Sequence, residues 1–482
     1  MYHLVLDQYQ SEAFVYARQS DPEIAALPLT YFSRFRSNAH YTELSNAILI
    51  AGRLYDGQGP LTRWMERAYG AGLFAVLAEN QVGVHLFPYY SYYCHPRAVM
   101  CRSAIDMAKA GVNRTAVLVD LWFLRILPRA FFQQPKSTDV WTYEVSLSSW
   151  FTGTSPVDFF KTYARYSVSQ FRELIRTEAA RPARGQYVFA HVMLPHDPFV
   201  LDGECRVREQ HGLPGNLFGE RDPDQYLDHV RCVNRLLAEF LAELRRLNRL
   251  DDALVIVQSD HGRYFRPGEA GTLNAFLPVA GRPAEALAFN QRKAGSDEWP
   301  DIHIELRSSA LLCIKAPGQQ AGSESNLPLQ TIDIAPTVLH HFGLPPGERP
   351  GRALQTLPDG WSREQEFMVY KRNSQGRLAA MLNVKPGEAS IYRKRDGHWG
   401  LVRRFDEPAD DAENRPGAWR VPGETSPGGG PTPDGMSAPA FRIEGAARDS
   451  RSVAVKRVER SRSGGFPALS SAMGPYGKRR PG

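Results

Sequence analysis

A run of branched aliphatic residues that stops at an acidic and a basic side chain constrains this sequence most. Leu254 to Val257 is followed by Gln258 and then by Ser259-Asp260-His261-Gly262. The run predicts a strand buried on both faces of a sheet, which needs helices on both sides. Ligands of open α/β sheets bind where strands end, so Asp260 and His261 are predicted to lie at a functional edge.

Strand patterns and helix patterns alternate along the chain. Apolar runs predict strands at residues 4–6, 73–77, 116–118, 187–193, 254–257 and 309–314. Apolar residues at every third or fourth position predict helices at 61–69, 156–179 and 226–247. We therefore predict an α/β fold, a three-layer α/β/α sandwich with a mostly parallel central sheet.

The character of the sequence changes after Pro345, so we divide the chain into three parts. Residues 1–345 are expected to form the α/β domain. Residues 346–408 are expected to form a small β-rich C-terminal subdomain, with strands at 366–370, 378–384 and 389–392. Residues 409–482 are dominated by Gly, Pro, Ser and Arg and are predicted to be a disordered tail.

The net charge of +6 belongs to the last part of that tail, residues 425–482. Residues 425–482 contain ten Lys or Arg against four Asp or Glu, so residues 1–424 are formally neutral. A neutral body gives no support for nucleic-acid binding, and we expect no nucleic-acid partner. The basic tail either attracts an acidic partner or a membrane surface, or is simply solvated.

Cysteine usage and hydropathy bear on the compartment. Five cysteines without a CxxC pair indicate neither a zinc ribbon nor a disulfide framework. No signal peptide and no spanning segment is recognised, so the chain as written is expected to be soluble. The apolar segment 117–128 is either core or a membrane-facing helix. A buried strand at the second residue is unusual for a domain terminus, so we expect a truncated N-terminus.

Two further segments add polar groups to the predicted site. The first apolar run ends at Asp7, which places a second carboxylate at a strand end. The stretch from Thr42 to Gly52 predicts a helix with Thr42 as N-cap and Gly52 as C-terminal stop. Each feature also has a purely structural explanation, because Asp-His-Gly suits a turn and threonine is a favoured cap.

Taken in order, these segments resemble the sulfatase branch of the alkaline phosphatase superfamily over residues 1 to about 345. The resemblance rests on Asp7, Thr42 to Gly52, the His-x-x-x-x-His-Asp-Pro motif from His191, Ser259 to Gly262, Arg307 to Gly318, and the Asp-x-x-Pro-Thr motif at Asp333. The stretch from Thr42 matches the spacing of the signature Cys-x-Pro-Ser-Arg-x-x-x-Leu-Thr-Gly, with Thr42 at the nucleophile position.

The resemblance implies an alkaline phosphatase-like fold and one divalent metal ion. Its ligands would be Asp7, Thr42, Asp260 and His261. Oxygen ligands with one imidazole leave the metal open among Mn²⁺, Mg²⁺, Ca²⁺ and Zn²⁺. A second metal is not favoured, because no histidine follows an aspartate by four residues.

The resemblance also implies roles in the reaction. Thr42 would be the nucleophile and His196 would protonate the departing alcohol. Ser45, His191 and Arg307 would contact the substrate. His191 alternates with apolar residues, however, and a core histidine explains it as well.

Thr42 departs from the sulfatase pattern, in which a cysteine or serine is matured to formylglycine. Threonine cannot be converted, and Leu44 and Asn46 replace the proline and arginine of the signature. A threonine nucleophile resembles instead the lipoteichoic acid synthases and the phosphoglycerol and phosphoethanolamine transferases. We therefore predict a hydrolase or transferase that acts on phosphoesters through a covalent intermediate on Thr42. The alternatives are a sulfuric ester hydrolase and a catalytically silent, metal-stabilised binding protein.

The resemblance bears finally on partners and location. It implies a small-molecule or lipid-linked phosphoester substrate and proximity to a membrane. If the N-terminus is truncated, the family context implies a membrane anchor and a catalytic domain outside the cytoplasm. The oligomeric state is not constrained.

Overall fold

A computed structural model describes four stretches of the chain. These are residues 1–104, 156–208, 223–277 and 301–405, without positions 60, 264, 266–270, 359 and 371–388. All of them belong to one compact unit, Met1–Ala418. The predictions for 116–118, 117–128, 378–384 and the tail 409–482 fall outside the described residues.

An eight-stranded mixed sheet forms the middle of the fold, in the order β4-β3-β5-β1-β6-β7-β2-β8. Its strands are β1 (Tyr2–Leu6), β2 (Thr30–Phe32), β3 (Gly83–Phe87), β4 (Met100–Cys101), β5 (Gln186–Val192), β6 (Val255–Gln258), β7 (Leu312–Lys315) and β8 (Ser323–Ser325). Strand β7 runs antiparallel to its neighbours β6 and β2, and the other pairs are parallel. The predicted mostly parallel sheet is confirmed.

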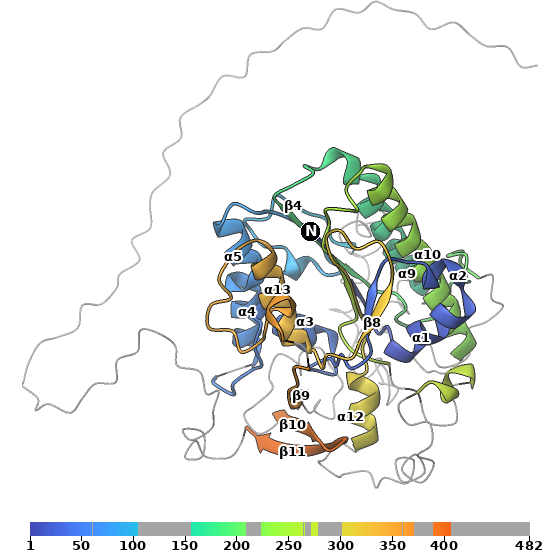
Figure 1. Ribbon diagram of the computed structural model, residues 1–482. Coiled ribbons are helices and arrows are strands. Elements are labelled where there is room, and N and C mark those ends of the chain that lie inside the picture. The colour runs from blue at the N-terminus through green and yellow to red at the C-terminus, as the bar shows by residue number, and fades with distance from the viewer. Residues whose placement is uncertain are drawn as a thin grey trace, which may run out of the picture. The chain divides into compact units, whose positions relative to one another are not determined.

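Helices cover both faces of this sheet (Figure 1). On one face lie α1 (Ser11–Ser20), α2 (Pro22–Ala25), α9 (Pro156–Arg176) and α10 (Pro223–Arg246), and on the other lie α3 (Thr42–Ala51), α4 (Leu61–Ala71), α5 (Leu73–Glu79) and α13 (Ile334–His341). Leu4 and Leu6 of β1 enter the first core, and Val5 enters the second. Because both faces are covered, every residue of β1, β5 and β6 is buried, including the polar residues His3, His191 and Gln258.

One predicted strand is a helix. The run from Leu73 to Leu77 lies in α5, where Leu73, Phe74 and Leu77 are fully buried. A short apolar run does not distinguish a buried strand from a buried helix, which explains the error. Gly72 precedes α5, and an added Cβ there would lie 2.2 Å from the Ala68 carbonyl oxygen, so the helices meet closely at this point. Within the described residues, no helix is long and apolar enough to cross a bilayer.

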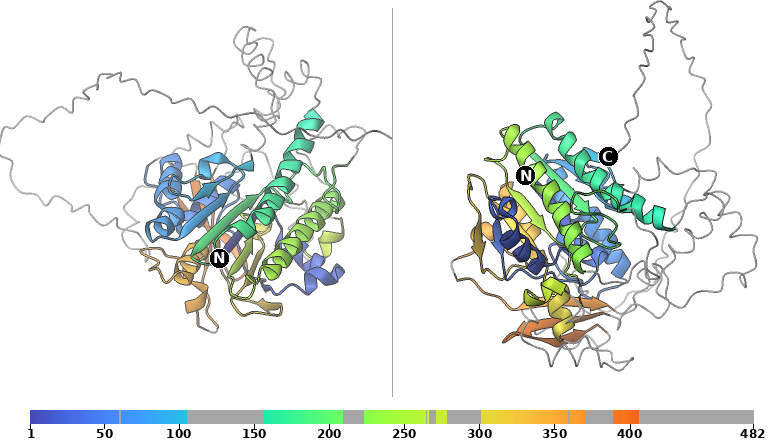
Figure 2. Two further views of the ribbon diagram at one scale, coloured as in Figure 1. Left: turned by 90° about the horizontal axis from the view of Figure 1, so that it is seen from above. Right: turned by 90° about the vertical axis from the view of Figure 1, so that its right-hand side faces the viewer.

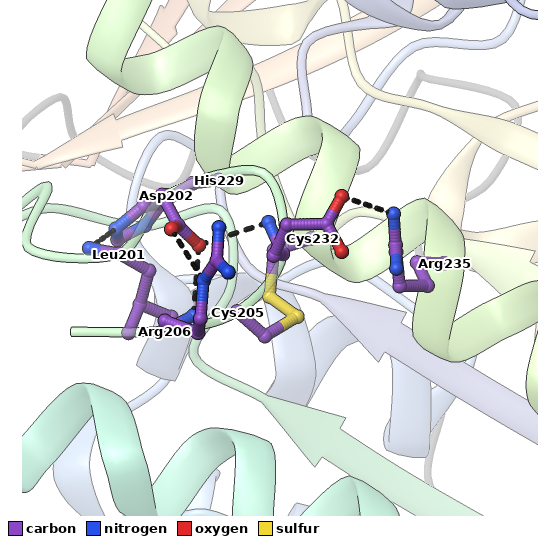
Figure 3. Close-up of a disulfide and its surroundings, with 8 residues drawn as sticks. Leu201, Asp202, Cys205, Arg206, His229, Cys232 and Arg235 are labelled. Atoms are coloured by element: carbon purple, nitrogen blue, oxygen red, sulfur yellow. Dashed lines mark hydrogen bonds and ion pairs between the residues drawn. A yellow bond between two sulfur atoms is a disulfide. The ribbon is translucent and has the colours of Figure 1, made fainter. Parts of the chain in front are cut away.

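Two disulfides correct the expectation from the cysteine pattern. Cys94 is bonded to Cys101 and Cys205 to Cys232, and Cys313 is a buried free thiol. Spacing in the sequence does not reveal bonds between cysteines of separate elements. The second bond joins the segment that follows β5 to α10 (Figure 3).

A separate antiparallel sheet follows the central one, in the order β11-β10-β9. Its strands are β9 (Gln365–Tyr370), β10 (Ala389–Arg395) and β11 (His398–Arg404), so the predicted strands at 366–370 and 389–392 are present. Figure 2 shows this sheet beside α12 (Asp301–Ser308). Trp399 Nε1 donates to Glu305 at 2.7 Å, and Lys394 Nζ lies 2.5 Å from the same carboxylate. These contacts attach the small sheet to the helix before β7.

Candidate metal and active site

The carboxyl ends of β1 and β6 bring three charged or basic side chains together. The two strands are parallel neighbours, so the residues that follow them lie at the same edge of the sheet. Asp7 follows β1, and Asp260 and His261 follow β6. One carboxylate oxygen of each aspartate and one ring nitrogen of the histidine lie within 4.8 Å of one another. All three side chains are buried.

Each of these carboxylates uses one oxygen inside the protein and leaves the other unbonded. Oδ2 of Asp7 lies 3.1 Å from the Thr42 hydroxyl and 3.1 Å from His191 Nε2. Oδ1 of Asp260 accepts from the backbone N–H of His261 at 2.9 Å and of Gln8 at 3.1 Å. Among the described residues, Asp7 Oδ1 and Asp260 Oδ2 have no hydrogen-bond partner. Buried carboxylate oxygens without a partner are unfavourable, and a bound cation would compensate their charge.

His261 is held in the tautomer that binds a cation. Its Nδ1 lies 3.0 Å from the carbonyl oxygen of Gly262, which only accepts, so Nδ1 carries the proton. Nε2 then carries the lone pair, and this nitrogen lies 3.4 Å from both Asp260 Oδ2 and Thr42 Oγ1. An added Cβ at Gly262 would lie 2.3 Å from the Leu306 carbonyl oxygen, which explains the glycine after the histidine. Carboxylate oxygens with one imidazole fit a divalent metal ion.

Thr42 is the first residue of α3 and not its N-cap, which corrects the prediction. The cap is Tyr41, and it makes no side-chain capping bond. The Thr42 hydroxyl donates to the Asp7 carboxylate, because a charged acceptor outcompetes a backbone partner. The helix N-terminus adds positive potential around this oxygen. At the other end, Gly52 adopts the left-handed conformation with φ 68°, as predicted.

Ser45 and His191 lie behind the carboxylates. Ser45 Oγ donates to the Asp260 carbonyl oxygen at 2.5 Å, and Ser37 Oγ lies at the same distance from it. Both serines are fully buried, so they lock the end of β6 against the start of α3. His191 bonds to Asp7, and its ring centroid lies 5.9 Å from that of Tyr93. The structure therefore places both residues that were predicted to contact substrate in hydrogen bonds to Asp260 and Asp7.

His196 lies in the segment after β5, next to Asp197. Its Nδ1 contacts the Asp197 carbonyl oxygen and lies 3.1 Å from Asp197 Oδ1. Both atoms are acceptors, so Nδ1 carries a proton and is bonded to Asp197, and Nε2 is the other ring nitrogen. Burial alone would lower the pKa of His196, but the carboxylates of Asp197 and Asp7 raise it to about 9. His196 is therefore an imidazolium at neutral pH.

The positive charge of His196 acts on the nearby carboxylate of Asp7. Burial alone would raise the pKa of Asp7, but the neighbouring His196 and His191 hold it below its usual value. The carboxylate therefore stays ionised although it has no exposed surface.

Arg307 lies in the last turn of α12, beside the Asp-His-Gly turn. Its carbonyl oxygen accepts from the Gly262 N–H at 2.7 Å. Burial and the neighbouring Arg307 hold the pKa of His40 well below its usual range, and His261 adds to this effect. Arg307 and His261 therefore both lie close enough to His40 for their charge to act on it.

Sequence reasoning missed a pair of residues next to the predicted ones. Arg263 follows Gly262, and its Nη1 lies 3.0 Å from Asp197 Oδ2. Each is adjacent to a predicted motif, which is the only signal in the sequence. Nothing in the sequence shows that the two residues pair.

The fold is an α/β sandwich whose sheet edge carries a buried cluster of two carboxylates and one imidazole beside a threonine hydroxyl. The family model for sulfatases matches residues 7–344, and the chain belongs to the sulfatase family. It is thus an enzyme of the class that acts on phosphoric or sulfuric ester bonds. This family is metal-dependent, and the cluster is its candidate site in this chain.

Several solved structures resemble this chain at low sequence identity. Phosphonate monoester hydrolase SpPMH from Silicibacter pomeroyi is 15% identical, with 85% of this chain and 92% of that chain covered and a TM-score of 0.47. Lipoteichoic acid synthase LtaP from Listeria monocytogenes is 13% identical, with coverages of 86% and 87% and a TM-score of 0.42. The C-terminal periplasmic domain of EcEptC from Escherichia coli is 10% identical, with coverages of 77% and 90% and a TM-score of 0.43. No curated sequence matches the chain.

Proposed function

We propose that this chain is a metal-dependent enzyme that transfers or hydrolyses a phosphoester through a covalent intermediate on Thr42. The observation that carries the proposal is the position of the Thr42 hydroxyl, 3.1 Å from Asp7 Oδ2 and 3.4 Å from His261 Nε2 at the start of α3. A threonine cannot become formylglycine, which favours phosphoesters over sulfate esters.

The metal would be held by Asp7, Asp260 and His261, with Thr42 beside them. Bound there, a divalent cation would favour the Thr42 alkoxide and would withdraw charge from the oxygens of the transferred group. The residues present leave its identity open among Mn²⁺, Mg²⁺, Ca²⁺ and Zn²⁺.

The first step forms the covalent intermediate. Thr42 Oγ1 forms a bond to phosphorus and gives up its proton toward the Asp7 carboxylate, which already accepts its hydrogen bond. The bond from phosphorus to the leaving oxygen breaks, and that oxygen keeps the electron pair. His196 Nε2 gives the oxygen a proton, so it leaves as an alcohol.

The second step releases the intermediate. His196 is now neutral at Nε2, while Asp197 keeps the proton on Nδ1. Nε2 takes a proton from water or from an acceptor alcohol as its oxygen attacks phosphorus. Thr42 Oγ1 departs and takes back the proton that the Asp7 carboxylate received in the first step. With water the outcome is hydrolysis, and with an alcohol it is transfer.

A metal and substrate panel tests this proposal. Purified protein is chelated, refilled with each of the four metals, and assayed with bis-p-nitrophenyl phosphate and p-nitrophenyl sulfate. We expect metal-dependent cleavage of the phosphodiester at a rate well above that of the sulfate ester. Faster sulfate cleavage would favour the sulfuric ester hydrolase. A bound metal without turnover of either ester would favour the silent binding protein.

The pH dependence of turnover tests the role of His196. Its pKa is raised, so the acid form persists below pH of about 9 and is lost as the pH rises through that value. Replacing Asp197 with Asn removes a carboxylate that raises this pKa, so the alkaline limb of kcat/KM should move to lower pH. The measurement is a pH–rate profile with diphenyl phosphate.

The matched control is Asp252→Asn, which breaks an ion pair with Arg184 on the surface. This variant should keep the wild-type limb. An unchanged limb in Asp197→Asn would contradict the role of Asp197.

The two disulfides support a location outside the cytoplasm, because such bonds persist in oxidising compartments. We expect protein isolated from its own compartment to show one reactive thiol per denatured chain, that of Cys313. The check is thiol labelling under denaturing conditions followed by mass spectrometry. Labelling of all five cysteines would place the protein in a reducing compartment.

A small or lipid-linked phosphoester remains the proposed substrate class.

A further inference from the structure

The segment that carries His196 leaves the sheet when β5 ends at Val192. Its later part is anchored to α10 by the Cys205–Cys232 disulfide and by the Leu201 N–H, which donates to His229 Nε2 at 3.0 Å (Figure 3). These anchors hold the chain beyond His196. The contacts that reach the His196 ring come instead from Asp197, which in turn is held by Arg263.

Arg263 is a buried cation that joins two segments of the site. Its side chain is 8% exposed, and Nη1 lies 3.0 Å from Asp197 Oδ2 and 2.9 Å from Gln8 Oε1. Gln8 follows Asp7 directly, so one guanidinium nitrogen connects the end of β1 to the His196 segment. The position of His196 relative to Asp7 therefore depends on this arginine.

Aromatic rings surround the guanidinium. Its carbon lies 4.5 Å from the ring centroid of Phe199, 5.4 Å from that of Phe265 and 5.6 Å from that of Tyr226. Cation–π contacts of this kind restrict a guanidinium that a polar environment would leave mobile. The backbone N–H of Arg263 also donates to Gln10 Oε1 at 2.6 Å. The Arg263 side chain is therefore held in one position, and so is the Asp197 carboxylate that it contacts.

Asp197 connects Arg263 to His196, because it is bonded to both residues. Its Oδ2 contacts Arg263 at 3.0 Å and its Oδ1 contacts His196 Nδ1 at 3.1 Å, so each carboxylate oxygen serves one cation. Without Arg263, the carboxylate keeps a single partner and can rotate. The imidazole then loses its fixed orientation.

We infer that Arg263 is a positioning residue, which acts through Asp197 to aim His196 Nε2 at the leaving oxygen. This inference rests on the proposed function. A merely structural ion pair would predict something different, because loss of folded protein lowers turnover of all substrates equally. Loss of proton donation lowers turnover mainly where the leaving oxygen is strongly basic.

The test is Arg263→Met, which keeps apolar contact with the rings and removes the charge. Turnover is compared on bis-p-nitrophenyl phosphate, whose leaving group needs little protonation, and on diphenyl phosphate, whose leaving group is more basic. We expect a loss of less than about 10-fold on the first substrate and about 100-fold or more on the second. His196→Ala should show the same pattern, and the double variant should be no slower than His196→Ala alone.

Arg249→Met is the matched control. Arg249 is a largely buried arginine that pairs with Glu178 at 2.6 Å, away from the site residues. Its loss should change both turnovers by the same small factor. If Arg263→Met does not fold, Arg263→Gln and Asp197→Asn are assayed on the same two substrates and should give the same unequal losses.

Two results would overturn the inference alone. One is an equal loss on both substrates, and the other is a double variant whose losses add. Absence of turnover by the wild type with every metal would overturn the proposed function and this inference together, so the two failures are distinguishable.

Discussion

Replacing Thr42 by alanine should abolish phosphodiester turnover and leave the fold in place. The loss should reach about 10³-fold or more, because removal of a nucleophile leaves only binding and electrostatic contributions. The hydroxyl makes hydrogen bonds to Asp7 at 3.1 Å and to His261 at 3.4 Å, so its removal should cost only about 1 to 2 kcal/mol of folding free energy. The measurements are kcat/KM on bis-p-nitrophenyl phosphate and the midpoint of thermal unfolding.

Thr42→Ser is the matched control, since it retains the oxygen and loses only a methyl group. It should keep most of the turnover, and its bound metal should equal that of the wild type. Mass spectrometry of rapidly quenched wild-type protein should find the transferred group on the peptide that contains Thr42. Turnover that survives in Thr42→Ala would move the reaction to another nucleophile and overturn the covalent step.

The edge of the sheet could be predicted because its residues follow recognisable strands. Asp7 and Asp260 each come after an apolar run, and parallel strands end at a common edge. The sequence does not predict that β1 and β6 are direct neighbours, because strand order depends on which helices cross over between them. The distance between the two carboxylates follows from that order and is not encoded in either motif.

The directions of short side chains could not be predicted. Thr42 lies one position inside the helix and not at its cap, and this shift turns its hydroxyl from the backbone to Asp7. Ser45 lies three residues further along α3, and its hydroxyl meets the Asp260 carbonyl oxygen. A sequence pattern specifies that these residues share a helix, but the partner of each hydroxyl depends on how the helix meets β6.

Contacts between separate elements could also not be predicted from the sequence. The pairs Asp197–Arg263 and Cys205–Cys232 join the segment after β5 to elements much later in the chain. The misassigned run at 73–77 has the same origin, because only the packing of α5 against α3 and α4 decides between strand and helix for so short a stretch.

Replacing Asp260 by asparagine should remove the metal ion. Oδ1 of Asp260 accepts two backbone N–H bonds, so asparagine would keep its oxygen there and place its NH₂ group at the Oδ2 position. That group repels a cation, and we expect affinity for Mn²⁺ or Zn²⁺ to fall by about 100-fold or more, since even outer partners of metal ligands contribute 10- to 100-fold. Isothermal titration of chelated protein measures the change.

The same variant separates metal binding from folding. Saturating metal at about 100 times its dissociation constant should stabilise the wild type by about 2.7 kcal/mol and leave Asp260→Asn unchanged. Without metal, the variant should be at least as stable as the wild type, because it removes repulsion between two buried carboxylates within 4.8 Å.

Asp333→Asn is the control, since Asp333 is a buried carboxylate whose partner is Arg363 at 2.8 Å. It should lower the unfolding midpoint with and without metal and keep the increment that metal gives. An increment that persists in Asp260→Asn would show that the cation binds elsewhere.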